Sequence, residues 1–77
     1  MTKTRGTQDF VLEVKFYREQ DGRWLADIPA LPGVTAYGRT KKQACAAAQA
    51  LALRLIADRL EHGEAVPGAL QVSFVAA

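Results

Sequence analysis

The segment over residues 29–43, PALPGVTAYGRTKKQ, restricts the fold more than any other part of the sequence. Two prolines and a glycine lie within its first five residues, and proline supplies no N–H to a β-ladder, while Gly33 readily takes positive φ. A strand must therefore end here. Thr40 and Gln43 have the spacing of a capping box, which predicts the start of a helix. The short apolar and aromatic run between these two signals predicts another strand.

The length of the chain, 77 residues, predicts one small domain. A domain of this size buries only roughly 60% of its unfolded surface, so we expect it to need additional support. Cys45 is the only cysteine, which excludes an intramolecular disulfide and indicates a reducing compartment. Self-association is the remaining common support, so we expect a homo-oligomer, either a dimer or a tetramer. Residues 1–9 are predicted to form a flexible tail, and residues 10–77 the domain.

Targeting and charge give few further signals. The N-terminus has no apolar core of a signal peptide, and no apolar run approaches the roughly 18 residues that a membrane helix needs. We therefore predict a cytoplasmic protein with no membrane partner. The formal net charge is +2, and acidic residues are interspersed among the basic ones, a balance that does not by itself indicate nucleic-acid binding.

Hydrophobic periodicity predicts an α+β fold in the order βββαβ. Apolar residues alternate with polar ones after residue 10, and Asp21-Gly22 predicts a hairpin into the second strand. The first three strands are expected to form an antiparallel meander with the helix on one face, and strands three and four to run in the same direction. The expected elements are strands over residues 10–17, 23–28 and 34–38 or 34–39, a helix over about 41–62 that ends at Gly63, and a strand over 70–74.

The expected helix is apolar on two sides. We assign one stripe to the sheet, namely Ala44, Ala48, Leu51 and Leu55, flanked by Ala47 and Ala52. The opposite stripe contains Ala46, Ala50, Leu53, Ala57 and Leu60, with Ile56 at its edge. The rest of the chain is too short to cover this second stripe, which predicts self-association through Leu53, Ile56, Ala57 and Leu60. The competing interpretation is that alanines are simply good helix formers and that exposed leucines are ordinary.

No pattern of reactive residues predicts catalysis. His62 falls in the last helical turn, where a cationic imidazole suits the negative end of the helix dipole. Cys45 borders the core stripe and is interpreted as a small buried hydrophobe, and one cysteine with one histidine cannot complete a metal site. The carboxylates are scattered, which gives two-metal catalysis weak support. We therefore predict that the chain is not an enzyme and has no catalytic, cofactor-binding or metal-binding residues.

Four motifs in order give the chain a resemblance to the HicB-like antitoxin domain. They are Asp21-Gly22-Arg23-Trp24, the Ile-Pro-Ala-Leu-Pro-Gly run over residues 28–33, Tyr37-Gly38-Arg39-Thr40, and a helix that carries Gln43-Ala44. The resemblance covers about residues 11–61. It implies a compact fragment of the ribonuclease H type of sheet, and a protein that binds and inhibits HicA, a small toxin that cleaves messenger RNA.

The resemblance also sets expectations about partners. We predict a non-catalytic antitoxin. Its loop over residues 29–33, here called the double-proline loop, and the neighbouring strand are expected to contact the toxin through Pro29, Leu31, Pro32, Tyr37 and Arg39. Many family members carry a further C-terminal DNA-binding domain. Residues 63–77 are enough for a strand but not for such a module, so operator binding is not expected. Two alternatives stay open, an oligomeric module that binds nucleic acid through its basic N-terminus, and a degenerate nuclease.

Overall fold

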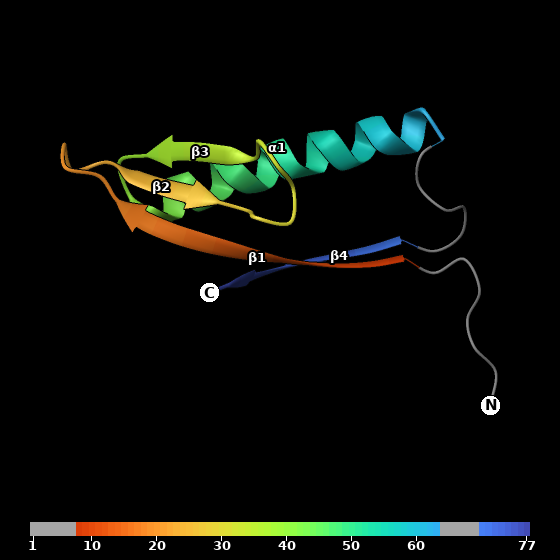
Figure 1. Cartoon of the computed structure of the whole chain (residues 1–77), viewed down its shortest axis with the longest axis horizontal. Coiled ribbons are helices and arrows are strands. Elements are labelled where there is room, and N and C mark those ends of the chain that lie inside the picture. The colour runs from red at the N-terminus through yellow and green to blue at the C-terminus, as the bar shows by residue number, and fades with distance from the viewer. Residues whose placement is uncertain (1–7, 64–69) are drawn as a thin grey trace.

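A computed structural model describes residues 8–63 and 70–77 of the chain (Figure 1). Its elements are β1 (Gln8–Arg18), β2 (Trp24–Asp27), β3 (Thr35–Gly38), α1 (Lys41–Glu61) and β4 (Leu70–Ala76). The predicted α+β class and the βββαβ order are therefore confirmed. The first strand begins at Gln8, so it takes in two residues that had been assigned to the tail.

The four strands form one mixed sheet in the order β3-β2-β1-β4. β1 and β2 pair antiparallel, as do β2 and β3, which confirms the meander. β4 pairs parallel with β1, so β3 and β4 run in the same direction at opposite edges of the sheet (Figure 1). The two neighbours of β1 use different parts of it, since residues 8–14 pair with β4 and residues 15–18 pair with β2.

The double-proline loop is held by backbone hydrogen bonds. The N–H of Leu31 donates to the carbonyl of Ile28 at 2.9 Å, and the N–H of Val34 donates to the carbonyl of Leu31 at 3.0 Å. Gly33 takes a φ of 87° at the second of these turns, in the left-handed region that favours glycine. The loop therefore folds back on itself, and the side chains of Leu31 and Val34 point into the core.

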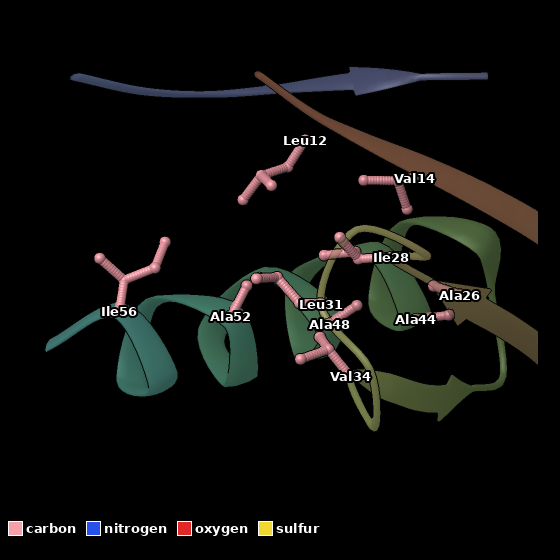
Figure 2. Packing of buried hydrophobic residues seen from close by; sticks show 10 residues of the cluster. All are labelled: Leu12, Val14, Ala26, Ile28, Leu31, Val34, Ala44, Ala48, Ala52 and Ile56. Carbon is pink, nitrogen blue, oxygen red and sulfur yellow. The ribbon is translucent and has the colours of Figure 1, made fainter. Parts of the chain in front are cut away.

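The core lies between one face of the sheet and α1 (Figure 2). It contains Leu12, Val14, Ala26, Ile28, Leu31, Val34, Ala44, Ala48, Ala52 and Ile56. Three of the four buried helix residues are alanines, so the helix backbone can approach the strands closely. α1 packs mainly on β3 and β2 (Figure 1).

The buried face of α1 differs from the expected stripe. The buried residues follow strict steps of four along the helix, from Ala44 to Ile56, while Leu51 and Leu55 are only half-buried and Ala47 is exposed. Rows of residues four apart are inclined to the helix axis, and a twisted sheet favours contact along such an inclined row. The prediction instead followed a stripe parallel to the axis, which made it wrong by about one helical position.

The N-terminus of α1 is capped by Thr40. The N–H of Gln43 donates to Oγ1 of Thr40 at 3.0 Å, and the N–H of Arg39 donates to Oε1 of Gln43, also at 3.0 Å. The predicted helix start is thus confirmed, with the reciprocal bond of the capping box made one residue earlier than usual.

Replacing Thr40 by alanine leaves the N–H of Gln43 without this acceptor, and we expect the free energy of unfolding to fall by about 1 kcal/mol. Urea denaturation followed by circular dichroism would measure the change. Lys42→Ala is the matched control, because Lys42 is exposed in the same turn and is expected to change stability by less than about 0.5 kcal/mol. Equal losses for the two variants would contradict a capping role.

Candidate protein-binding surface

The face of the sheet opposite α1 carries a row of large exposed side chains. Tyr17 of β1 pairs with Leu25 of β2, and Leu25 pairs with Tyr37 of β3. Partners in register point to the same face, and the neighbouring row of Phe16, Ala26 and Ala36 packs on the core side. Tyr17 and Tyr37 are 49% and 48% exposed, and Leu25 between them is half-buried. We call Tyr17, Leu25 and Tyr37 the tyrosine row.

Arg23 is oriented over one end of the tyrosine row. Its guanidinium carbon lies 4.3 Å from the centre of the Tyr37 ring, and its Nε donates to the carboxylate of Asp21 at 2.7 Å. The backbone N–H of Arg23 also donates to Asp21, at 3.0 Å. This backbone hydrogen bond, aided by the arginine side chain, lowers the pKa of Asp21 below its usual value. The turn thus positions a cation against an aromatic ring on an exposed face.

Polar groups border the tyrosine row along the strands. Lys15, Asp27 and Thr35 form the next row on the same face, and Oγ1 of Thr35 donates to the carboxylate of Asp27 at 3.1 Å. Aromatic residues with an arginine at the centre and polar groups at the rim are a composition found where proteins bind other proteins. Within residues 8–63 and 70–77, no three His, Cys, Asp or Glu residues lie close enough together to hold a metal ion.

The structure separates the residues that were expected to contact a toxin. Tyr37 and Arg39 lie at and just beyond the end of β3, whereas Pro29 and Pro32 lie in the loop that precedes β3. All four are exposed. Leu31 is only 4% exposed and belongs to the core, because the hydrogen-bonded loop turns its side chain inward (Figure 2). Leu31 is therefore removed from the candidate contact residues.

The exposed stripe of α1 is also smaller than expected. Leu53 and Leu60 are 48% and 43% exposed, and Ala57 between them is exposed. Ile56 is 5% exposed, because it continues the inclined row of buried residues, so the sequence interpretation of Ile56 as an interface residue is wrong. Self-association through the remaining three residues stays a prediction.

Two grooves flank α1. One, of about 610 Å³, lies where the first turns of the helix approach Phe16 and Ala76, with Lys41 and Cys45 in its lining. Nζ of Lys41 lies 4.9 Å from the centre of the Phe16 ring and 5.5 Å from that of Trp24. The other, of about 340 Å³, is lined by residues that include Pro32, Gly33, Leu51, Arg54 and Leu55. Pro32 thus faces the side of the helix rather than the tyrosine row.

Cys45 and His62 both lie on α1 or at its end. Cys45 is half-buried, and its Sγ accepts a hydrogen bond from Nε2 of Gln49 at 3.5 Å. His62 is the C-cap residue, and its Nδ1 lies 2.8 Å from the carbonyl oxygen of Asp58 and 3.3 Å from its carboxylate. Its place at the helix end is as expected, and its contacts fit a role in finishing the helix.

Sequence reasoning missed Tyr17, Leu25 and Arg23 as site residues. Period-2 alternation puts Tyr17 on the opposite face from Phe16, and Leu25 on the opposite face from Trp24 and Ala26, so part of the signal is present in the sequence. What it lacked was the register between β2 and β3, which brings Tyr37 beside Leu25. That register depends on the conformation of the double-proline loop, which the residue types alone do not define.

The basic residues near the N-terminus, on which the nucleic-acid alternative depends, lie outside the described residues. In the part of the chain that the structure describes, no helix combines the length and the apolar character needed to cross a membrane. Comparisons of the chain with family models, with curated proteins and with solved structures found no match.

Proposed function

We propose that this chain is a non-catalytic, HicB-like antitoxin that binds and neutralises a HicA-type toxin, a small protein that cleaves messenger RNA. The ordered motifs over residues 11–61 support this function. The observation that carries it is the tyrosine row, which exposes two tyrosines on a rigid sheet beside an oriented arginine. We place the protein in the cytoplasm, where such a toxin would meet its substrate and where Cys45 would stay reduced.

The tyrosine row has the physical properties of a binding hot spot. Tyrosine and arginine are enriched among the residues that contribute most to binding, because they combine a large apolar surface with a polar end. Tyr17 and Tyr37 lie on strands that both pair with β2, so their backbone is already ordered before docking. Arg23 is held by Asp21 against the Tyr37 ring, which reduces the side-chain freedom that docking would remove. A partner that covers this face gains the apolar contact without first ordering a loop.

Docking alone accounts for neutralisation in this proposal. A toxin that cleaves RNA must expose its catalytic surface to a long substrate, and a protein seated on that surface blocks access. The antitoxin supplies no reactive group. Its contribution is an affinity high enough to keep the toxin occupied, which depends on the dissociation constant relative to the concentrations of the two proteins in the cell.

Co-expression with the toxin tests the proposal. The candidate is a small basic protein with an essential histidine, encoded in the neighbouring reading frame. Expressed alone it should arrest growth and cleave messenger RNA, and with this chain it should do neither and should co-purify with it. A neighbouring product that is not toxic, or one whose toxicity and purification are unaffected by this chain, would contradict the antitoxin function.

The same purified chain separates the alternative functions. A salt-dependent mobility shift with RNA or duplex DNA in the absence of any toxin would support a nucleic-acid-binding module. Metal-dependent cleavage of RNA by the purified chain would support a degenerate nuclease.

A further inference from the structure

The outer edge of β4 carries backbone groups that none of the described strands pairs with. The N–H of Ala77 donates to the carbonyl of Val14 at 2.9 Å, which fixes the direction of the backbone groups at the end of this strand. Because these groups alternate along a strand, Val75, Ser73 and Gln71 direct their N–H and C=O groups toward β1. Val72, Phe74 and Ala76 direct theirs away from the sheet, where the described residues supply no fifth strand.

This edge lacks the features that normally prevent strand pairing. Edge strands are usually short, or carry charged residues, proline or a bulge. β4 has seven residues, LQVSFVA, with no charge and no proline, and its residues pair with β1 without interruption. The opposite edge is different, because β3 has only four residues and Arg39 follows it directly. β4 is therefore the edge better suited to pair with another strand.

We propose that a second copy of this chain pairs with β4 through its own β4, antiparallel and about a two-fold axis. A strand that meets itself across such an axis must run antiparallel, and its outward N–H and C=O groups then match those of the second copy. No charge lies on the strand, so pairing brings no like charges together. In the register that uses the whole strand, Val72 faces Phe74 of the second copy, a favourable aromatic and β-branched pair.

The side chains along the β4 edge also favour a second copy of the chain as the partner. α1 packs mainly on β3 and β2 and makes few contacts with β4, so Val72 and Phe74 are only half-buried on the helix side of the sheet. Val75 on the opposite face is 46% exposed. A second β4 would cover apolar side chains on both faces at once, whereas a partner seated on either face would leave the backbone groups unpaired.

Pairing through β4 would also place a second strand beside Ala76, which lines the larger groove beside α1. A two-fold axis perpendicular to the sheet leaves both tyrosine rows on the same side of one continuous sheet. If the proposed function holds, one dimer therefore offers two toxin sites, although the pairing itself does not depend on a toxin.

The experiment uses the full chain alone, so its result is independent of the toxin. Light scattering over a concentration series should give twice the 8.4 kDa chain mass, decreasing on dilution. Ser73→Lys adds a charge to an exposed residue of the edge, and we expect the dissociation constant of the dimer to rise about fivefold. Val72→Pro removes an outward N–H that only a second copy uses, and we expect a rise of at least about tenfold.

Val11→Lys is the matched control. Val11 is the register partner of Ser73, lies on the same face one strand farther from the edge, and is 66% exposed. The same charge there should leave the dimer intact. Hydrogen exchange adds a second readout, because dimer formation should slow exchange at the amides of Val72, Phe74 and Ala76 specifically.

Four results would overturn the proposal. The first is a monomer at every concentration up to about 0.5 mM, and the second is a dimer that neither Ser73→Lys nor Val72→Pro weakens. The third is that Val11→Lys weakens the dimer as much as Ser73→Lys does. The fourth is that Leu53→Lys weakens the dimer and Ser73→Lys does not, which would assign the contact to the exposed stripe of α1. Circular dichroism identifies a variant that fails to fold, and if Val72→Pro does so, Ser73→Lys and the exchange pattern still decide.

Discussion

Gly38→Ala is expected to lower the free energy of unfolding by about 3 kcal/mol. Gly38 ends β3 at the point where the sheet meets the first turn of α1. A Cβ at this position would overlap the backbone nitrogen of Ala44 and lie 2.9 Å from the carbonyl carbon of Gln43. These are backbone atoms, and the N–H of Ala44 is held by the carbonyl of Thr40 at 3.0 Å. The helix must therefore move away from the sheet to admit the methyl group.

The cost is large for a protein of this size. Domains have roughly 0.05–0.15 kcal/mol of stability per residue, so a chain of 77 residues has about 4–12 kcal/mol in total. Urea denaturation should show a much lower midpoint with an unchanged slope. At the low end of this range about 1 kcal/mol would remain, so roughly one molecule in six of the variant would be unfolded.

Gly22→Ala distinguishes this steric effect from the conformational effect of removing a glycine. Gly22 has a φ of 91° and open space around its Cα, so alanine there meets only backbone strain, of about 1 kcal/mol. Gly38 has no such φ but has no room for a Cβ. A loss for Gly38→Ala no greater than that for Gly22→Ala would mean that the contact between β3 and α1 adjusts easily.

Local signals in the sequence predicted most of the fold. Alternation of apolar residues, the turn at Gly22 and the cap at Thr40 act over a few residues, so they can be read without knowing the rest of the structure. They gave the order of elements and the meander. The direction of β4 relative to β3 also followed, because each flanks the single helix.

The parts that could not be predicted depend on contacts between distant residues. The burial of Ile56 follows from the angle at which α1 crosses a twisted sheet, and the burial of Leu31 from the way its loop folds back. The tyrosine row requires the register of β2 against β3. The free edge of β4 requires the strand order, which placed β4 beside β1 rather than beside β3.

The double variant Tyr17→Ala/Tyr37→Ala is expected to raise the dissociation constant for the toxin about a thousandfold. Hot-spot tyrosines typically lose at least 2 kcal/mol of binding free energy on truncation, and about 4 kcal/mol for the pair corresponds to roughly a thousandfold. Isothermal titration calorimetry with the toxin would measure the change. Co-expression should give the same answer, because a toxin that is no longer occupied arrests growth.

Two controls separate lost contact from lost structure. Leu53→Ala truncates a side chain on the helix that is 48% exposed, the same fraction as Tyr37, and should leave toxin affinity within about threefold of wild type. Tyr37→Phe keeps the ring under Arg23 and should lose much less affinity than Tyr37→Ala. The double variant should still unfold cooperatively, because both tyrosines lie outside the core, on the face of the sheet opposite α1.

The pattern of losses then identifies the docking surface. If the double variant binds the toxin more weakly and Leu53→Ala binds it normally, the toxin is assigned to the face of the sheet opposite α1. The reverse pattern would assign it to α1 and would remove the tyrosine row from the proposed function. Unchanged binding in both variants would leave Pro29 and Pro32 of the double-proline loop as the candidate contact residues. Leu31 is buried, and Arg39 is only two residues from Tyr37, so neither is a separate exposed candidate.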